Sequence, residues 1–323
     1  MSFDFDAAVV SPHRMQPGLR RLLPGASQLT PAVQPHRGVS RHLREKLAVL
    51  GCFSPQALLC EPGFDPAPAL QALAGLAAQE QPQAFQWGGP EAAGRWCAPA
   101  LGWAVDAADQ PRATGRDWPE VGPLLASLPA PWRRPALLSL AFEEDFAIVD
   151  GASGHLPWLA VALPSMWAPE HKVGRHFSAV HAPVADNRLI VGAAAPLLAL
   201  VTGPGAERWE RFVWTISPHP RLHAHPQRVD PAGWPTALDD DGLAAQAWWR
   251  TERQTFLPVA GQAQAVFTIK VDVRPLATAL QRPAHAAKVH QALASMSPAV
   301  LAYRGLDTAQ ATLLRWLARR AAA

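Results

Sequence analysis

The chain contains little cysteine, and its cysteines are placed too far apart to act together. The three cysteines, Cys52, Cys60 and Cys97, form no CxxC pair. An odd number without short spacing argues against a disulfide framework and against a cysteine-held iron–sulfur cluster. Cys52 and Cys60 have apolar neighbours, so we expect packed, unreactive thiols in a reducing compartment.

Long apolar runs are also absent from the 323-residue sequence. The longest candidate, 189–201, is too short to cross a bilayer, which needs roughly 20 apolar residues. The first residues, MSFDFDAAVVSPHR, are acidic early and lack the basic start and apolar stretch of a secretory signal. We therefore expect a cytoplasmic protein with no membrane partner.

Positive charge is present but dispersed. The formal net charge is +3, and Lys46, Lys172, Lys270 and Lys288 are the only lysines. The arginines form no run of five or more, so nucleic acid is not an expected partner. The sequence also lacks GxGxxG after a strand, a Walker loop, HExxH and GxSxG. These motifs indicate dinucleotide-binding enzymes, P-loop NTPases, zinc metalloproteases and α/β-hydrolases, so none of these four classes is indicated here.

The composition changes near residue 135. Residues 1–134 are rich in proline and glycine, which predicts a loop- and helix-rich extension packed on a core. Residues 135–280 contain the strand patterns, and residues 281–323 are expected to form C-terminal helices. The whole predicts an α+β fold, an antiparallel sheet with helices on one face and an apolar chamber between the two layers.

The expected elements follow from the spacing of apolar residues and from the positions of proline and glycine. Within 189–200, Pro196 is expected to kink the helix. Helices are expected at 41–50, 67–80, 119–128, 189–200, 284–295, 299–303 and 308–319, and strands at 136–142, 145–149, 156–163 and 208–217, with a hairpin formed by 253–258 and 264–274.

The stretch LPSMWAPEHKVGRHFSAVHAPV at 163–184 is expected to contain a helix around which the rest of the chain is arranged. Pro169 is suited to a first helical turn, and Pro183 ends the helix. Val173, Phe177, Val180 and His181 follow at i, i+4, i+7 and i+8 and form one apolar stripe. A histidine on that stripe is either a packed core residue or the axial ligand of a buried metal, and the spacing leaves both open.

Two other polar groups have both a structural and a functional interpretation. The segment Thr251-Glu252-Arg253-Gln254 forms either an ion pair near the sheet edge or a polar cluster that faces the chamber. His219, His223 and His225 lie in a proline-broken loop from which a zinc site can be drawn. No cysteine or acidic residue has the spacing to complete that zinc site.

Taken in order along the chain, several blocks resemble the haem-binding alpha subunit of haem-dependent oxidative N-demethylase, also called dimethylamine monooxygenase. The resemblance covers most of the chain, and six blocks in the expected order are far more specific than any one of them. The blocks are HRMQPGLRRL at 13–22, LPSMWAPEHKVGRHFSAVHAPVADN at 163–187, RWERFVWTI at 208–216, the pair His225-Pro226, RTERQTFLPV with AVFTIKV at 250–271, and MSPAVLAYRGL at 296–306.

This resemblance implies a fold, a cofactor and an activity. The fold is similar to that of PAS sensor domains, an antiparallel sheet with helices that enclose haem b. The implied activity is NADPH-driven monooxygenation of a small secondary amine such as dimethylamine, with O2 as oxidant. Electrons come from a separate subunit that carries FMN and a 2Fe–2S cluster, which agrees with the lack of nucleotide and cluster motifs in this sequence.

The resemblance also favours particular residues. His181 becomes the expected iron ligand, its second nitrogen held by a carbonyl or a water, with His176 as the fallback. Phe177 is expected beside the cofactor, and Lys172 and Arg175 either neutralise haem propionates or are simply solvated helix charges. On the sheet side the candidate catalytic residues are Arg211, Trp214, Glu252 and Arg253.

The sheet candidates are chosen from the chemistry that the reaction needs. A guanidinium stabilises the negative charge that develops on dioxygen, and a carboxylate or an aromatic face holds an alkylammonium ion. Arg211 and Trp214 fall on opposite faces of a regular strand, so we expect only one of them to point inward. Two alternatives to the oxygenase remain: a PAS-like haem sensor of gas or redox state, and a haem-free relative that binds another small molecule.

Overall fold

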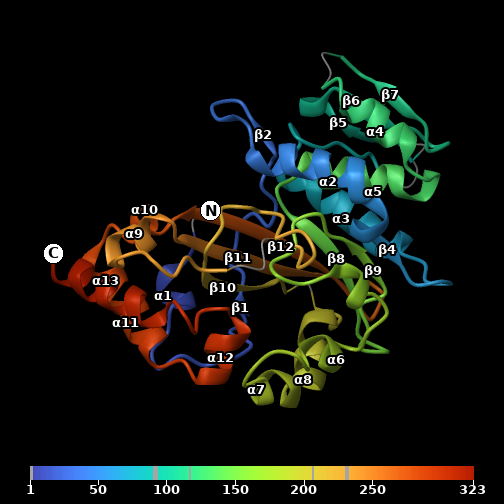
Figure 1. Ribbon diagram of the computed structural model, residues 1–323. Helices are drawn as coiled ribbons and strands as arrows, with labels where there is room; N and C mark the ends of the chain where they lie inside the picture. The colour runs from blue at the N-terminus through green and yellow to red at the C-terminus, as the bar shows by residue number, and fades with distance from the viewer. Residues whose placement is uncertain (1–2, 90–93, 116–117, 206, 230–232) are drawn as a thin grey trace.

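The computed structural model describes residues 3–89, 94–115, 118–205, 207–229 and 233–323, and a central antiparallel sheet organises them (Figure 1). The three longest strands, β10 (Trp209–Ser217), β11 (Trp248–Pro258) and β12 (Gln264–Pro275), are neighbours. Shorter strands complete the sheet in the order β1-β10-β11-β12-β8-β9-β4, where β1 is Arg20–Arg21, β8 is Asp145–Asp150, β9 is Trp158–Ala160 and β4 is Leu58–Cys60.

The register divides the side chains of the long strands between two faces. Arg211 of β10 lies opposite Gln254 of β11, and Gln254 lies opposite Ile269 of β12. Directly opposed residues of an antiparallel pair point to the same side, so these three share a face, which we call the site face. Trp214 and Arg253 have the other parity and belong to the opposite face, which we call the lobe face.

Helices cover both faces of the sheet, so the prediction of helices on one face was wrong. On the lobe face, α2 (Arg41–Ala57), α3 (Ala67–Glu80) and α5 (Ala130–Ala141) share a core with Phe146 and Ile148. On the site face, α6 (Phe177–His181) and α8 (Ala194–Thr202) pack against Val149. Strand β8 is apolar at successive positions, and a strand that is apolar on both faces has to be covered on both.

Smaller elements extend this core at both ends of the chain (Figure 1). Near the C-terminus, helices pack around a second apolar core that includes Trp214 and Trp249. None of the described helices is both long enough and apolar enough to cross a membrane. The remaining elements are α1 (Phe5–Ala8), β2 (Val33–Gln34), β3 (Gly38–Val39), β5 (Trp96–Ala98), η1 (Pro99–Leu101), β6 (Trp103–Val105), β7 (Pro111–Ala113), α4 (Val121–Ser127), α9 (Asp240–Ala245), α10 (Leu276–Ala279), α11 (Pro283–Ala294), α12 (Pro298–Tyr303) and α13 (Gln310–Ala322).

Most of the expected elements are confirmed, and several other expectations were wrong. Residues 136–142 form the end of α5 rather than a strand. The break near Pro196 comes earlier, at Ala193, between α7 (Arg188–Gly192) and α8. Cys52 and Cys60 are exposed, because their positions fall on the outer side of α2 and on the edge strand β4.

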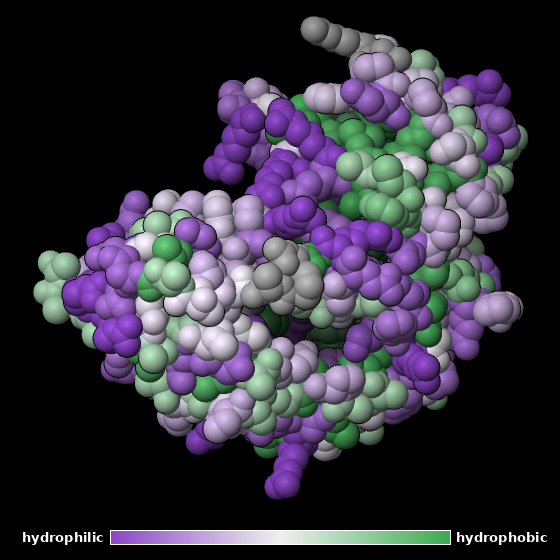
Figure 2. Space-filling view, in the orientation of Figure 1, coloured by the Kyte–Doolittle hydropathy of each residue, from purple (hydrophilic) through white to green (hydrophobic). Residues whose placement is uncertain are grey.

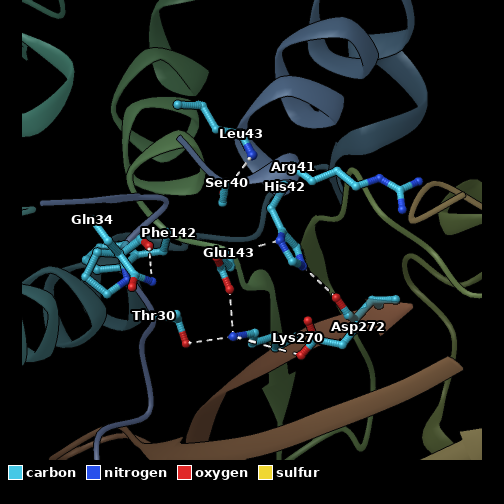
Figure 3. A network of polar contacts seen from close by, with 12 residues as sticks. Thr30, Gln34, Ser40, Arg41, His42, Leu43, Phe142, Glu143, Lys270 and Asp272 are labelled. Atoms are coloured by element: carbon cyan, nitrogen blue, oxygen red, sulfur yellow. Dashed lines mark hydrogen bonds and ion pairs between the residues drawn. The ribbon is translucent and has the colours of Figure 1, made fainter. Parts of the chain in front are cut away.

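A buried polar network joins the N-terminal helices to the lobe face (Figure 3). Lys270 of β12 forms a 2.6 Å ion pair with Glu143 and donates a 3.3 Å hydrogen bond to the hydroxyl of Thr30. His42 of α2 bonds through Nε2 to the carbonyl oxygen of Val271 at 2.6 Å. These contacts fix α2 and the 142–145 turn against β12, and they leave the site face free for other elements.

Candidate functional site

The segment that carries His181 is anchored by backbone pairing rather than by one continuous helix. It forms a short 3-10 turn, η2 (Pro169–His171), and then α6, so the predicted helix from Pro169 to His181 was wrong. Gly174 has a φ of +67°, which ends the first turn. The backbone then pairs with 154–156: Phe177 donates to the carbonyl of Gly154 at 2.7 Å and Leu156 donates to that of Arg175 at 3.0 Å.

His181 ends α6 with one ring nitrogen fixed. Its Nδ1 lies 2.8 Å from the carbonyl oxygen of Phe177. A carbonyl oxygen only accepts, so Nδ1 carries the proton and Nε2 keeps a lone pair. Burial lowers the pKa of His181 to about 4, the charges of Arg211 and Lys172 act in the same direction, and the bond to Phe177 opposes them. The imidazole is therefore neutral at pH 7, and its Nε2 lone pair has no hydrogen-bond partner among the described residues, which is the form that ligates a metal.

The floor of the site consists of Arg211 on β10 and Glu252 on β11. Glu252 lies opposite Val213, two residues along from Arg211, so both side chains are on the site face. Arg211 has a buried Nε without a hydrogen-bond partner in the described parts of the chain. Burial lowers the pKa of Arg211, and the nearby charge of Glu252 opposes that shift. The carboxylate itself accepts a 2.6 Å hydrogen bond from the amide of Gln254, which fixes its orientation.

Helix α12 supplies a second wall that the sequence analysis did not select. Arg304 donates to the carbonyl oxygen of Trp214 at 2.5 Å. Burial lowers its pKa to about 10, and the charges of Tyr303 and Glu252 oppose this. Burial also raises the pKa of Tyr303, and Glu252 contributes to that rise. Tyr303 is the only tyrosine in the chain, and it lies in the block MSPAVLAYRGL. These two features of the sequence could have indicated that Tyr303 and Arg304 belong to the site.

Figure 2 shows that the surface is hollowed on this side of the molecule. In Figure 1 the same region lies between α12 and the segment α6–α8, with the long strands behind it.

Two of the predicted sheet residues lie on the lobe face, away from His181. Trp214 stacks on Trp249 with ring centroids 4.9 Å apart and donates its Nε1 proton to the carbonyl of Ala8 at 3.1 Å. Arg253 pairs with Glu210 at 3.0 Å on the same face. Both side chains have structural partners, and of the four sheet candidates the structure brings together Arg211 and Glu252.

The candidates around α6 differ in what they do. Phe177 packs its ring against His181, with centroids 4.2 Å apart. Lys172 donates to the carbonyl oxygen of Val180 at 2.6 Å, and Arg175 is exposed. His176 caps α6, because its Nδ1 accepts the backbone N–H of Ser178 at 3.1 Å. That bond places the ring proton on Nε2, so His176 does not present a free lone pair inward.

The histidines of the 219–225 loop serve the structure around the site. The ring of His225 bonds to Glu170 at 3.1 Å, and Nδ1 of His223 bonds to the carbonyl of Ala162 at 2.7 Å. Arg250 donates to the carbonyls of Arg221 and Leu222 at 2.6 and 2.7 Å. In the described ranges no three His, Cys, Asp or Glu side chains are grouped to hold a metal ion, so the zinc interpretation has no support from this loop.

A family model described as haem-dependent oxidative N-demethylase, alpha subunit-like, matches residues 125–314, which is more than half of the chain. The chain belongs to this family. The matched region contains His181, Arg211, Glu252 and Arg304, and it begins just before α5. The family description names haem, and the residues present fit that group: a neutral histidine with a free Nε2, an aromatic ring beside it, and buried cationic groups with few carboxylates to offset them.

Proposed function

We propose that the protein is the haem-binding subunit of a monooxygenase that removes a methyl group from a small secondary amine, of which dimethylamine is the simplest. In the balanced reaction the amine, O2, two electrons and two protons give the demethylated amine, formaldehyde and water. The observation that carries the proposal is the neutral His181 ring, whose Nδ1–H binds the carbonyl of Phe177 and whose Nε2 has no partner in the part of the chain that the structure describes. We take the strands and α6 within residues 135–280 to form the PAS-like haem-binding core that the family resemblance implies, and α12 to add a wall from outside that range.

Haem b, when bound, would activate dioxygen and pass electrons to it. The residues that would hold it are His181 as ligand and Phe177 as apolar contact. The bond from Nδ1 to the Phe177 carbonyl increases the basicity of the ligand and fixes the orientation of its ring. Lys172 secures the last turn of α6 through Val180, and we assign it this positioning role in place of a propionate contact.

Arg211 and Glu252 have complementary tasks in this proposal. The guanidinium of Arg211 donates hydrogen bonds toward negative charge that develops on oxygen. Glu252, held by Gln254, binds the alkylammonium group of the substrate. The ring of Tyr303 lies near the same carboxylate and offers an aromatic face to the N-methyl groups.

The chain needs an external source of electrons. We propose a partner reductase subunit that carries FMN and a 2Fe–2S cluster and oxidises NADPH. The family description, alpha subunit-like, supports an assembly of more than one subunit.

The test is to load the purified protein with haem and compare wild type with His181→Ala, His176→Ala and His36→Ala. His36 is exposed and serves as the matched control. We expect a Soret band and formaldehyde release from dimethylamine, with O2 and a two-electron reductase, in wild type and in the His36 variant. His181→Ala should lose haem. A haem-loaded protein that binds O2 reversibly and releases no formaldehyde would contradict the enzyme and favour a sensor.

A further inference from the structure

The site contains a carboxylate and a guanidinium that are not paired with each other. In the described parts of the chain neither Arg211 nor Glu252 has an ion pair within 4.0 Å. We propose that the substrate is a zwitterionic N-methyl amino acid, whose ammonium group binds Glu252 and whose carboxylate binds Arg211. This substrate class rests on the proposed function and narrows it.

Among the arginines of this site, Arg211 has a side-chain N–H group that no described residue binds. Arg304 is bound to the carbonyl of Trp214, and Arg250 donates to two loop carbonyls. The Nε of Arg211 is buried and has no partner among the described residues. A buried donor without a partner costs free energy, and a ligand carboxylate removes that cost with a bidentate pair. One edge of the guanidinium binds that carboxylate, and the other stays available for oxygen.

The charge balance also distinguishes a zwitterion from a simple amine. The negative charge of Glu252 acts on three buried arginines, which are Arg211, Arg250 and Arg304. A dialkylammonium ion would add another positive charge to a buried site that already holds an excess. A zwitterion adds no net charge, and its carboxylate offsets Arg211 directly.

The spacing of the two groups fits an α-amino acid. Arg211 and Glu252 are diagonal neighbours on adjacent strands, with Cα atoms about 7–8 Å apart in such a pair. Their charged ends are more than 4.0 Å apart. N-Methylglycine carries its ammonium and carboxylate on the two sides of one carbon, so it reaches both. Its reaction would be N-methylglycine, O2, two electrons and two protons to glycine, formaldehyde and water, with electrons from the partner reductase.

The test is calorimetric binding of three probes to the haem-loaded protein: N-methylglycine, dimethylamine and N-methylethylamine. N-Methylethylamine keeps the secondary amine and lacks the carboxylate. We expect N-methylglycine to bind at least about 10-fold more tightly than either amine. Arg211→Gln should remove that preference and leave amine binding unchanged or stronger, Arg211→Lys should retain part of it, and Arg315→Gln, a surface control on α13, should change nothing.

The same binding data separate two kinds of failure. If dimethylamine binds and releases formaldehyde while N-methylglycine binds no better, the substrate class is wrong and the proposed function stands. If N-methylglycine binds with the expected dependence on Arg211 but no N-methyl compound releases formaldehyde, the zwitterion site stands and the demethylase does not. If Arg211→Gln weakens the binding of all three probes equally, Arg211 has a general structural role and the inference is wrong.

Discussion

Lys172 donates a 2.6 Å hydrogen bond to the carbonyl oxygen of Val180, the residue directly before His181. This contact places a positive charge at the C-terminal end of α6, where helix carbonyls favour a cation. It also brings that charge close enough to lower the pKa of His181. One side chain thus fixes the turn that presents the histidine and helps to keep its ring neutral.

Replacing Lys172 with methionine should raise the pKa of His181 in the haem-free protein from about 4 toward its ordinary value of 6.5. The rise should be partial, because burial is the largest cause of the shift and remains. An NMR titration of the His181 ring protons measures it. Lys288→Met is the control, since Lys288 pairs with Asp6 at the surface. An unchanged His181 pKa in Lys172→Met would show that Lys172 does not act on the ring.

The low pKa of His181 makes the stability of the haem-free protein sensitive to acid. The folded-state pKa of about 4 lies below the ordinary value of 6.5, so the neutral ring contributes stability above pH 6.5 that is lost as pH falls toward 4. Between pH 7 and pH 4 the free energy of unfolding should fall in both proteins, and we expect the fall to be about 2 kcal/mol smaller in His181→Gln than in wild type. Urea unfolding at both pH values measures this, and an identical loss in both proteins would contradict a desolvated His181.

The buried pair Lys270–Glu143 should couple the N-terminal helices to the sheet. Its side chains are 13% and 10% exposed, so removal of one partner leaves a poorly hydrated charge. Lys270→Met should destabilise the fold by about 3 kcal/mol, and Lys270→Met with Glu143→Gln should cost less than the two single changes added together. Denaturant unfolding of the four proteins gives the coupling energy. Additive effects would mean that the pair does not interact in solution.

Gly154 should be required for the position of α6. Its φ is +72°, and a Cβ at this position would collide with the ring of His176, which caps α6. Gly261 has nearly the same φ, +73°, with open space around it. Gly261→Ala should therefore cost only backbone strain, about 1 kcal/mol, and Gly154→Ala about 2 kcal/mol more with weaker haem binding. An equal loss of stability in the two variants, measured by thermal unfolding, would show that the His176 ring moves aside and does not collide with the new Cβ.

The sequence predicted the long strands and the parity of their side chains well, because both depend on local alternation. Arg211 and Trp214 fall on opposite faces of β10, as the period of two requires. That Glu252 shares the face of Arg211 depends on the register between β10 and β11, which local alternation does not determine. The sequence does not show which face of the sheet lines the site, because that depends on which helices pack against each face. Trp214 was therefore a reasonable candidate that the C-terminal helices bury instead.

The errors have physical causes that lie outside the local pattern. The stripe that suggested one helix from Pro169 to His181 is interrupted by Gly174 and by backbone pairing with residues 154–156, a contact between separate segments. Residues 136–142 are apolar throughout, so their pattern does not separate a buried strand from a buried helix. Tyr303 and Arg304 reach the site only because α12 folds back over β10.

The central claim is that Nε2 of His181 binds the haem iron, and imidazole rescue tests it most directly. His181→Gly should lose haem, as is expected for His181→Ala, and haem added together with imidazole should bind and restore the wild-type Soret and visible bands, because imidazole takes the place of the missing ring. A His181→Gly protein that holds haem with the wild-type spectrum before imidazole is added would contradict the account and move the ligand to another residue.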